Sequence, residues 1–467
     1  MPLWPQNSTR ISTQRKNGPA PGEIGQNYNT EGNQVTQSMV YVGMVGDMLH
    51  AGHINIVTKA RELGQVIVGV LTDEAAASYK RVPFMKYKER AKVVENIAGV
   101  ARVVPQETLS YKPNLLEYKP KFVVHGDDWK FGDKVSVARQ EVVDTLKEWG
   151  GELIEVPYTT GVSSTLFHQA LEEQGVMARN RQARLRHLFE VKDCVRIIEA
   201  HSGLAALIAS RTRSSNKTFD ALWQSSLTDA TLRGKPDIEI VDNGSRLSTI
   251  NEIFEASTLP LIYDGDTGGF PERVHQLARS LDRAGVSALC LEDKTGVKRN
   301  SLYGQEAGQK QAPIEVFCER IQAAKAASGV GDMMFISRIE SLILGEGQHR
   351  ALERAEAYLD AGSDAILIHS TAKDSSEVSD FSRELRRQGH NQPLLVVPTT
   401  FANTPITELA DAGINGVIYA NQLLRAAYPN MVQVAKEILD YDCCPDQISA
   451  RYLASTKDIL DLIPVPR

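Results

Sequence analysis

Two blocks of apolar runs that alternate with helical patterns cover most of this chain. In the first block, a strand-like run at 39–45 precedes a helical pattern at 53–63, which Gly64 ends. The alternation continues with strands expected at 66–71, 122–125 and 152–156 and with helices expected at 87–97 and 137–149. Strands that alternate with helices are typical of a parallel sheet covered on both faces. The first block therefore predicts a Rossmann-like α/β domain.

The second block repeats one pattern, a helix that ends at glycine and is followed by an apolar strand. Helical patterns end at Gly285, Gly362 and Gly413, and an apolar strand follows each of them, at 286–291, 364–369 and 416–420. Glycine readily takes the left-handed conformation that ends many helices. Further strands are expected at 220–223, 259–264, 333–336 and 394–398. A β/α repeat over a region of this length predicts a TIM-like (β/α)8 barrel, and a doubly wound open sheet is the alternative.

The composition is that of an ordinary globular protein with more than one domain. The chain has 467 residues, of which 42% are hydrophobic and 24% are charged. We divide it into a disordered tail at 1–38, a first domain at 39–172, a linker at 173–186 and a barrel domain at 187–467. The tail is rich in Asn, Gln, Gly, Pro and Thr, and no amphipathic basic helix of a mitochondrial presequence can be drawn in it.

Charge and cysteine usage narrow the functional class further. The net charge of -6 gives no basic surface for nucleic acid. No apolar run approaches the roughly 20 residues of a membrane helix, and the opening lacks an apolar signal core. The five cysteines have no metal-ligand spacing, and an odd number is a poor disulfide framework. We expect a cytoplasmic protein that binds neither nucleic acid nor membranes.

Polar side chains stand at the ends of the strands expected in the second block. They are Trp223, Asp264, Asp266, Glu292, Arg338 and His369. In a barrel, the carboxyl ends of the strands converge on one mouth, where catalytic groups collect. Each residue also has an ordinary structural explanation, but a shared mouth explains all of them at once. Three or four acids there favour a hard cation such as Mg²⁺, and the basic loop at 294–300 favours an anionic substrate.

A pair of histidines follows the first strand of the first block. His50 and His53 lie three residues apart at a helix start, with Gly52 between them. A run of hydroxyls at 163–165 precedes a second expected helix. Helix starts of this kind suit an anion, although a lone His-x-x-His or a serine N-cap is often only structural.

These two segments carry a resemblance to the cytidylyltransferase-like nucleotidyltransferase family, over about 40–171. The sequences His50-Ala51-Gly52-His53 and Gly161-Val162-Ser163-Ser164-Thr165 match its two signatures. The resemblance implies that His50 and His53 stabilise the α-phosphate of CTP as an acceptor attacks and pyrophosphate leaves, while Lys80 grips the phosphates. The implied nucleotide site comprises Gly43, Asp47, Gly52, Asp127, Gly161, Ser163, Ser164 and Thr165. In one departure, Tyr158 stands where the family usually has arginine.

The second block resembles phosphoenolpyruvate mutase of the isocitrate lyase/phosphoenolpyruvate mutase superfamily, over about 184–462. The motifs that carry the resemblance are at 223–227, 264–268, 292–301, 337–340 and 368–370. Lyases of the superfamily place a catalytic cysteine in a Lys-Lys-Cys-Gly-His sequence, and this chain has none there, which disfavours C–C cleavage. Ser226 stands where mutases usually have glycine, and Gly269 where they often have an aromatic residue.

The mutase resemblance also implies roles for the residues of the barrel mouth. Mg²⁺ would be held by Asp264 directly and by Asp266, Glu292 and Asp293 through water. The substrate would contact Trp223, Ser225, Ser226, Leu227 and Ser301. The phosphoryl group would be held by Asn300, Arg338 and His369 and guided by Asp237. Lys298 would close over the site on a loop with Gly296 as its hinge, which would exclude water.

Together the two resemblances imply a bifunctional enzyme of phosphonate biosynthesis, as in fosfomycin-type fusions. One domain would interconvert phosphoenolpyruvate and phosphonopyruvate, and the other would transfer CMP from CTP to a phosphonate such as 2-hydroxyethylphosphonate or 2-aminoethylphosphonate. Two alternatives stay open: a barrel that is a phosphonopyruvate hydrolase or another lyase of the superfamily, and a first domain that is a non-catalytic module for nucleotide binding or oligomerisation. The resemblance also implies a homo-oligomer, a dimer or tetramer, in which 449–462 packs on another subunit.

Overall fold

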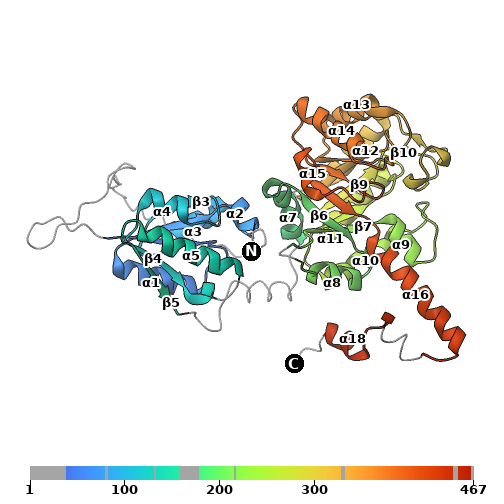
Figure 1. Ribbon diagram of the computed structural model, residues 1–467. Helices are drawn as coiled ribbons and strands as arrows, with labels where there is room; N and C mark the ends of the chain where they lie inside the picture. The colour runs from blue at the N-terminus through green and yellow to red at the C-terminus, as the bar shows by residue number, and fades with distance from the viewer. Residues whose placement is uncertain are drawn as a thin grey trace, which may run out of the picture.

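The computed structural model describes residues 38–78, 83–130, 133–157, 178–214, 217–327, 332–444 and 451–463. Most of the expected tail, Lys80, Tyr158 and the whole of 161–165 lie outside the described residues. Within the described residues, the two predicted α/β domains are confirmed (Figure 1).

The first domain is a five-stranded parallel sheet with the order β3-β2-β1-β4-β5. Its elements are β1 (Met39–Met44), α1 (Ala51–Leu63), β2 (Gln65–Leu71), α2 (Asp73–Ala77), α3 (Tyr87–Glu95), β3 (Val100–Gln106), α4 (Lys112–Tyr118), β4 (Phe122–Gly126), the 3-10 helix η1 (Asp127–Lys130), α5 (Asp133–Lys147) and β5 (Glu152–Val156). The sequence pattern missed β3, since this edge strand is half exposed and lacks a continuous apolar run. The central strands β1 and β2 are buried along almost their whole length, as their apolar runs predicted.

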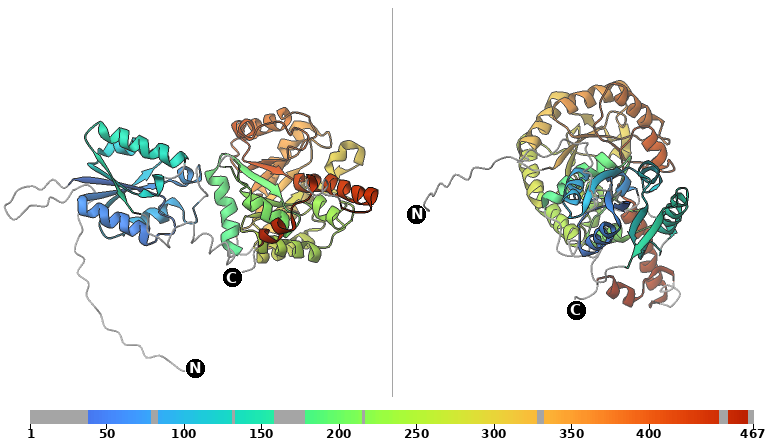
Figure 2. Two further views of the ribbon diagram at one scale, coloured as in Figure 1. Left: turned by 60° about the horizontal axis from the view of Figure 1, so that its bottom comes forward. Right: turned by 90° about the vertical axis from the view of Figure 1, so that its left-hand side faces the viewer.

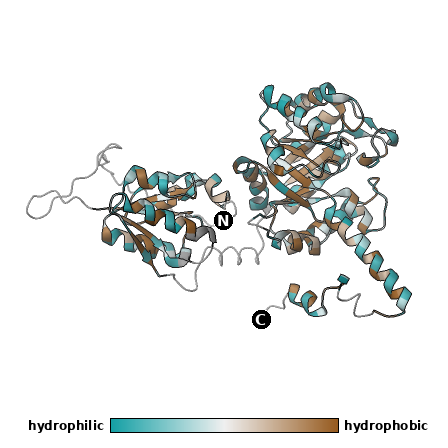
Figure 3. Ribbon diagram, in the orientation of Figure 1, coloured by the Kyte–Doolittle hydropathy of each residue, from teal (hydrophilic) through white to brown (hydrophobic). Residues whose placement is uncertain are grey.

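The second domain is a closed barrel of parallel strands in the order β12-β13-β14-β15-β6-β7-β8-β9. Pairing of β9 with β12 and of β15 with β6 closes the ring, which rules out the open sheet. The barrel strands are β6 (Val195–Glu199), β7 (Ala221–Gln224), β8 (Leu261–Asp264), β9 (Ala288–Glu292), β12 (Met334–Ile339), β13 (Ala365–Ile368), β14 (Leu394–Val396) and β15 (Gly416–Tyr419). The strands form the brown apolar interior of Figure 3.

An outer layer of helices surrounds the barrel strands (Figure 2). The helices of this layer are α8 (Gly203–Arg211), α9 (Ser226–Leu232), α10 (Asn243–Ala256), α11 (Pro271–Ala284), α12 (Ile314–Ala327), α13 (Gly347–Asp360), α14 (Ser376–Arg387) and α15 (Ile406–Asp411). Outside it lie α7 (Ala178–Val191), α16 (Gln422–Tyr441) and α18 (Thr456–Leu462). The strand β9 is followed by β10 (Lys294–Thr295), the 3-10 helix η2 (Ser301–Ala307) and β11 (Lys310–Gln311). Gly285, Gly362 and Gly413 all have φ between 84° and 107°, which supports their predicted role in ending helices.

Helix α7 connects the two domains and lies across the amino ends of the barrel strands. It begins inside the segment that the sequence assigned to a linker. Gln182 donates hydrogen bonds to the carbonyls of Asp282 and Val286, just before β9. On its other side, α7 contacts the first domain, where Lys86 pairs with Glu190 at 2.9 Å. The first domain is therefore attached at the end of the barrel opposite the carboxyl ends of its strands (Figures 1 and 2).

Helix α16 extends away from the barrel and buries none of its residues (Figure 1). Tyr428, Met431 and Leu439 are each more than two-thirds exposed, and so is Leu460 of α18. In the described part of the chain, no helix combines the length and the apolar character that crossing a membrane requires.

Candidate functional site at the mouth of the barrel

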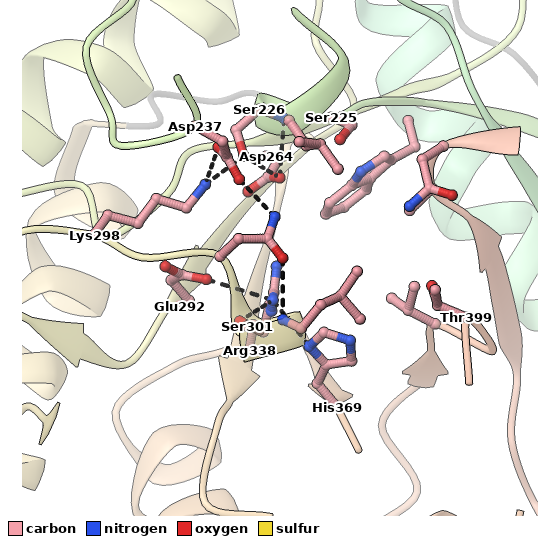
Figure 4. A pocket seen from close by; sticks show the side chains of 17 residues that line it. Ser225, Ser226, Asp237, Asp264, Glu292, Lys298, Ser301, Arg338, His369 and Thr399 are labelled. Carbon is pink, nitrogen blue, oxygen red and sulfur yellow. Dashed lines mark hydrogen bonds and ion pairs between the residues drawn. The ribbon is translucent and has the colours of Figure 1, made fainter. Parts of the chain in front are cut away.

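A pocket of about 490 Å³ opens at the carboxyl ends of the barrel strands. Figure 4 shows Asp237, Ser226 and Asp264 toward one side of this pocket and Arg338 and His369 toward the other. The pocket is lined by Trp223, Ser225, Ser226, Leu227, Asp237, Asp264, Glu292, Lys298, Asn300, Ser301, Leu302, Arg338, His369, Val397, Thr399, Ala420 and Asn421. The structure thus brings together most of the residues predicted for the mutase site. Val397, Thr399, Ala420 and Asn421 were missed, because β14 and β15 carry no charged residue at their ends that would have marked them.

Three buried carboxylates stand at the ends of β8 and β9. Asp264 accepts hydrogen bonds from the Ser226 backbone N–H and hydroxyl. Asp266 has φ 55°, a left-handed conformation that is strained for a residue other than glycine, and it pairs with Arg246 and Lys298. Glu292 forms ion pairs with Lys294 at 3.2 Å and with Arg338 at 3.5 Å. Neither of its oxygens accepts a hydrogen bond from the described residues, and burial raises the pKa of its carboxyl to about 7.

These carboxylates have the chemistry that a divalent cation requires. Lys294 and Arg338 offset part of the charge of Glu292, but its oxygens still lack hydrogen-bond donors, and oxygen ligands are those that Mg²⁺ prefers. Asp264, Asp266 and Glu292 would hold the ion, with waters completing its shell. In the described residues, no three acidic, histidine or cysteine side chains are already arranged to bind a metal ion directly, because the Lys298 ammonium lies among the acids. The donor set fits a cation bound mainly through water.

Asp293 does not belong to this cluster, which corrects the prediction that it helps to hold the metal. It adjoins Glu292, and its carboxylate turns away from the pocket. It accepts hydrogen bonds from Gln311 and Tyr358 at 2.9 Å and from Arg354 at 3.3 Å, all outside the barrel mouth. The reason is the alternation of side chains along an extended chain, which sends neighbouring residues to opposite sides.

The segment at 294–301, here called the catalytic loop, reaches over the pocket. Lys298 donates to Asp237 at 2.5 Å and contacts Asp266 at 2.6 Å, and Asn300 donates to the other oxygen of Asp237 at 2.7 Å. Burial by itself lowers the pKa of Lys298, but the surrounding acids raise it by more. The net pKa is raised, so the ammonium stays charged. Gly296, the expected hinge, has φ 78°, which glycine adopts without strain.

Arg338 and His369 form the opposite wall. Arg338 Nη2 donates to His369 Nδ1 at 2.9 Å, and its Nε donates to Glu340 at 2.5 Å. Glu340 Oε1 also lies 3.3 Å from His369 Nδ1, but the shorter contact is with the guanidinium, which can only donate. We therefore assign His369 Nδ1 as the acceptor, with the proton on Nε2. Burial and the neighbouring guanidinium lower the pKa of His369, which favours this neutral form. His369 Nε2 has no partner in the described residues, so an N–H donor is left for a ligand in the pocket.

The predicted substrate contacts divide into two groups. Trp223, Ser225 and Leu227 line the pocket, as expected. The hydroxyl of Ser301 is already committed, since it accepts from Lys294 and Arg338 and donates to Glu340 at 2.6 Å. Ser301 therefore orients Arg338 from behind, and its hydroxyl has no remaining proton for a substrate.

The histidine pair of the first domain begins α1 as predicted. His50 Nδ1 accepts from the Gly52 N–H, and His53 Nδ1 accepts from the His50 N–H. Both imidazoles consequently carry their proton on Nε2, a donor suited to a phosphate. Burial lowers the pKa of His50, which keeps the ring neutral near pH 7. The pair lies where the strand order reverses between β1 and β4, the usual ligand-binding position of an open parallel sheet.

Three other residues predicted for the nucleotide site, Gly43, Asp47 and Asp127, lie in different environments. Asp127 follows β4 at the same edge of the sheet. The Asp47 carboxylate accepts from the N–H groups of Phe84 and Met85, so it fixes the segment before α3. Gly43 makes room for Tyr111, whose ring lies 2.5 Å from the position of a Cβ. Asp47 and Gly43 thus have structural roles that the sequence pattern did not reveal.

Comparison with known proteins assigns both domains to families. A family profile described as phosphoenolpyruvate phosphomutase matches residues 185–439, more than half of the chain. The chain belongs to the phosphoenolpyruvate phosphomutase family. A second profile, described as cytidylyltransferase-like, matches residues 45–170, so the family domain is preceded by a cytidylyltransferase-like domain. The phosphoenolpyruvate phosphomutase of Tetrahymena pyriformis is 33% identical over 261 residues, which are 56% of this chain and 84% of the relative.

Solved structures resemble the barrel domain. The crystal structure of phosphoenolpyruvate phosphomutase from Streptomyces platensis subsp. rosaceus is 37% identical, with a TM-score of 0.56, and the match covers 60% of this chain and 94% of that one. A phosphonopyruvate hydrolase in complex with oxalate and Mg²⁺ is 31% identical, with a TM-score of 0.54 and the same coverage of 60% and 94%. A phosphomutase and a phosphonopyruvate hydrolase thus resemble the barrel at comparable sequence identity.

Proposed function

We propose that the barrel interconverts phosphoenolpyruvate and phosphonopyruvate. The observation that carries the proposal is that the donors Arg338, His369 Nε2–H and Asn300 line one pocket with the carboxylate of Asp264, while Glu292 pairs with Arg338 at 3.5 Å between them. A phosphate-bearing carboxylic acid suits this polarity. Its phosphoryl group would meet the donors, and its carboxylate end would meet the cation held by the acids.

The residues support an isomerisation in which the phosphoryl group moves within one molecule. The P–O bond to the enol oxygen breaks, that oxygen becomes the ketone, and the C2=C3 π electrons form the new P–C bond. Arg338, His369 and Asn300 hold the phosphoryl oxygens in place, so a loose transition state needs no covalent nucleophile. In agreement, no cysteine lines the described pocket, and the hydroxyls of Ser226 and Ser301 are tied up in hydrogen bonds. Mg²⁺, when bound, supplies positive charge for the carboxylate and the enolate oxygen.

A second candidate is hydrolysis of phosphonopyruvate, because a phosphonopyruvate hydrolase is as similar to the barrel as the mutases are. Coupled assays separate the two. The mutase converts phosphonopyruvate to phosphoenolpyruvate, so NADH oxidation by lactate dehydrogenase requires added pyruvate kinase and ADP. The hydrolase gives pyruvate directly, and NADH oxidation without pyruvate kinase would overturn the mutase assignment.

We also propose that the first domain transfers CMP from CTP to a phosphonate, with release of pyrophosphate. The two Nε2–H donors of His50 and His53 at the start of α1 support stabilisation of a phosphate in transfer. Candidate acceptors are 2-hydroxyethylphosphonate and 2-aminoethylphosphonate. Pyrophosphate release that depends on both CTP and an acceptor is the expected result, and its absence with every phosphonate would favour a domain that only binds nucleotide.

For the whole chain we propose a cytoplasmic homo-oligomer that serves phosphonate synthesis. The exposed apolar side chains of α16 and α18, among them Met431 and Leu460, support a contact with a second copy of the chain. A monomer in analytical ultracentrifugation at micromolar concentration would contradict the oligomer.

A further inference from the structure

The hydroxyl of Ser226 connects the catalytic loop to a carboxylate on the barrel wall. Ser226 begins α9, directly after β7, and its side chain is buried beneath the loop. Its Oγ donates to Asp264 Oδ2 at 2.9 Å and accepts from Lys298 Nζ at 2.8 Å (Figure 4). The hydroxyl thus links Lys298 to Asp264 through two consecutive hydrogen bonds.

The contacts of Lys298 show why this hydroxyl matters. An ammonium has three N–H donors. Three acceptors surround Lys298 Nζ: Asp237 at 2.5 Å, Asp266 at 2.6 Å and the Ser226 hydroxyl at 2.8 Å. Asp237 and Ser226 accept hydrogen bonds from the ammonium, while Asp266 contributes an ion pair, so Ser226 is the uncharged acceptor of this set. Its own proton is used by Asp264, so neither end of the contact is left unsatisfied.

We propose that Ser226 is a positioning residue that latches the catalytic loop in its closed position. The inference rests on the proposed function, in which the closed loop keeps water from the phosphoryl group. When the loop is open, water solvates the ammonium and the latch contributes nothing. When the loop is closed, the ammonium is buried, and a missing acceptor leaves one donor unsatisfied. The hydroxyl therefore favours the closed loop specifically.

The latch has a consequence for the products. Water that enters through an open loop captures the phosphoryl group: the P–C bond of phosphonopyruvate breaks, water oxygen bonds to phosphorus, and the proton passes to C3, which gives pyruvate and inorganic phosphate. An intact latch therefore favours phosphoenolpyruvate over hydrolysis. An unsatisfied buried donor corresponds to a shift of roughly tenfold in the open-to-closed equilibrium.

Limited trypsin digestion tests the latch without reference to catalysis. Arg299 is exposed whereas Lys298 is buried, so cleavage between Arg299 and Asn300 reports access to the loop. The full-length Ser226→Ala variant should be cut at this bond about tenfold faster than the wild type, with the fragments identified by mass. The matched control is Ser210→Ala, which removes a partly buried hydroxyl of α8 that bonds to Ser257 away from the mouth, and its loop cleavage should equal that of the wild type.

A double-mutant cycle separates a latch from a general effect on folding. If Ser226 acts through Lys298, then Ser226→Ala should accelerate cleavage in the wild type but not in a Lys298→Met background. Equal acceleration in both backgrounds, or none in the wild type, would overturn the proposal. With phosphonopyruvate as substrate, Ser226→Ala should also raise the ratio of phosphate to phosphoenolpyruvate. A wild type that yields neither product would refute the proposed function, while the proteolysis would still decide the latch.

Discussion

The adjacent acids Glu292 and Asp293 allow a sharp test of the site, because the sequence treats them alike and the structure does not. Asp293 is fully buried and accepts from Gln311, Tyr358 and Arg354. Asp293→Asn removes the negative charge that compensates Arg354. It can also place the amide NH₂ group, which donates, against side chains that themselves donate. Breaking a buried pair in this way costs about 3–5 kcal/mol. For a domain of this size, the cost corresponds to a fall of about 10 °C in the Tm of the barrel.

Glu292→Gln should have the opposite profile. The oxygens of Glu292 accept no hydrogen bond in the described residues, and burial has already raised the pKa of its carboxyl to about 7. Burial raises the pKa of the Asp293 carboxyl as well, so the contrast rests on hydrogen bonds. Glu292→Gln breaks none of them and weakens only the ion pairs with Lys294 and Arg338, so it should destabilise the barrel less than Asp293→Asn does. The loss should instead fall on Mg²⁺ affinity and on turnover, because a carboxylate ligand has gone.

Calorimetry and Mg²⁺ titration of both variants decide between these profiles. Asp380→Asn is the matched control for the charge change: it lies in an exposed pair with Arg383 and should alter stability by less than about 1 kcal/mol. The reasoning fails if Asp293→Asn melts with the wild type and loses Mg²⁺ affinity, since Asp293 would then be a ligand. It also fails if Glu292→Gln binds Mg²⁺ normally.

Three further predictions follow from the sites. Asp264→Ala should abolish turnover in the barrel and leave pyrophosphate release from CTP intact, and loss of both activities would contradict two independent sites. His53→Ala should do the reverse and slow nucleotidyl transfer by roughly 10²–10³-fold, as expected for loss of one donor to the transferred phosphate; a normal rate in that variant would discredit the role of the histidine pair. Since Glu292 must lose its proton to bind a cation and burial raises its pKa to about 7, Mg²⁺ affinity by calorimetry should fall about fivefold from pH 7 to pH 6 and level off above pH 8, whereas an unchanged affinity would place the titrating carboxyl outside the metal site.

The attachment of the two domains has a consequence for the reaction sequence. The barrel site opens at the carboxyl ends of the strands, whereas α7 and the first domain lie at the amino ends. A product of the barrel must therefore pass through solvent before it reaches the histidine pair of the same chain. The arrangement suits two sites that serve non-consecutive steps.

The features that could be predicted from the sequence were those with a local pattern. Apolar runs located the buried strands except β6, which the expected strands did not include. Charged residues at strand ends marked Asp264, Glu292 and Arg338 as neighbours in space. The edge strand β3 was missed because solvent covers one of its faces, and Thr399 was missed because an uncharged residue at a strand end carries no signal.

Side-chain direction was the other limit. Alternation sends the side chains of Glu292 and Asp293 to opposite sides, but the sequence does not say which side faces the pocket, and the contact of Asp293 with Arg354 decides it. The double hydrogen bond of Ser226 likewise depends on how close the catalytic loop comes to α9, which no spacing in the sequence expresses. Contacts between segments far apart in the chain therefore had to come from the structure.

Phosphorus NMR on the purified full-length protein, with phosphonopyruvate and Mg²⁺ and without CTP, tests the central claim most directly. The account predicts that the phosphonate signal disappears as a phosphoenolpyruvate signal grows. Inorganic phosphate without phosphoenolpyruvate would contradict it and would make the barrel an enzyme that breaks down phosphonates.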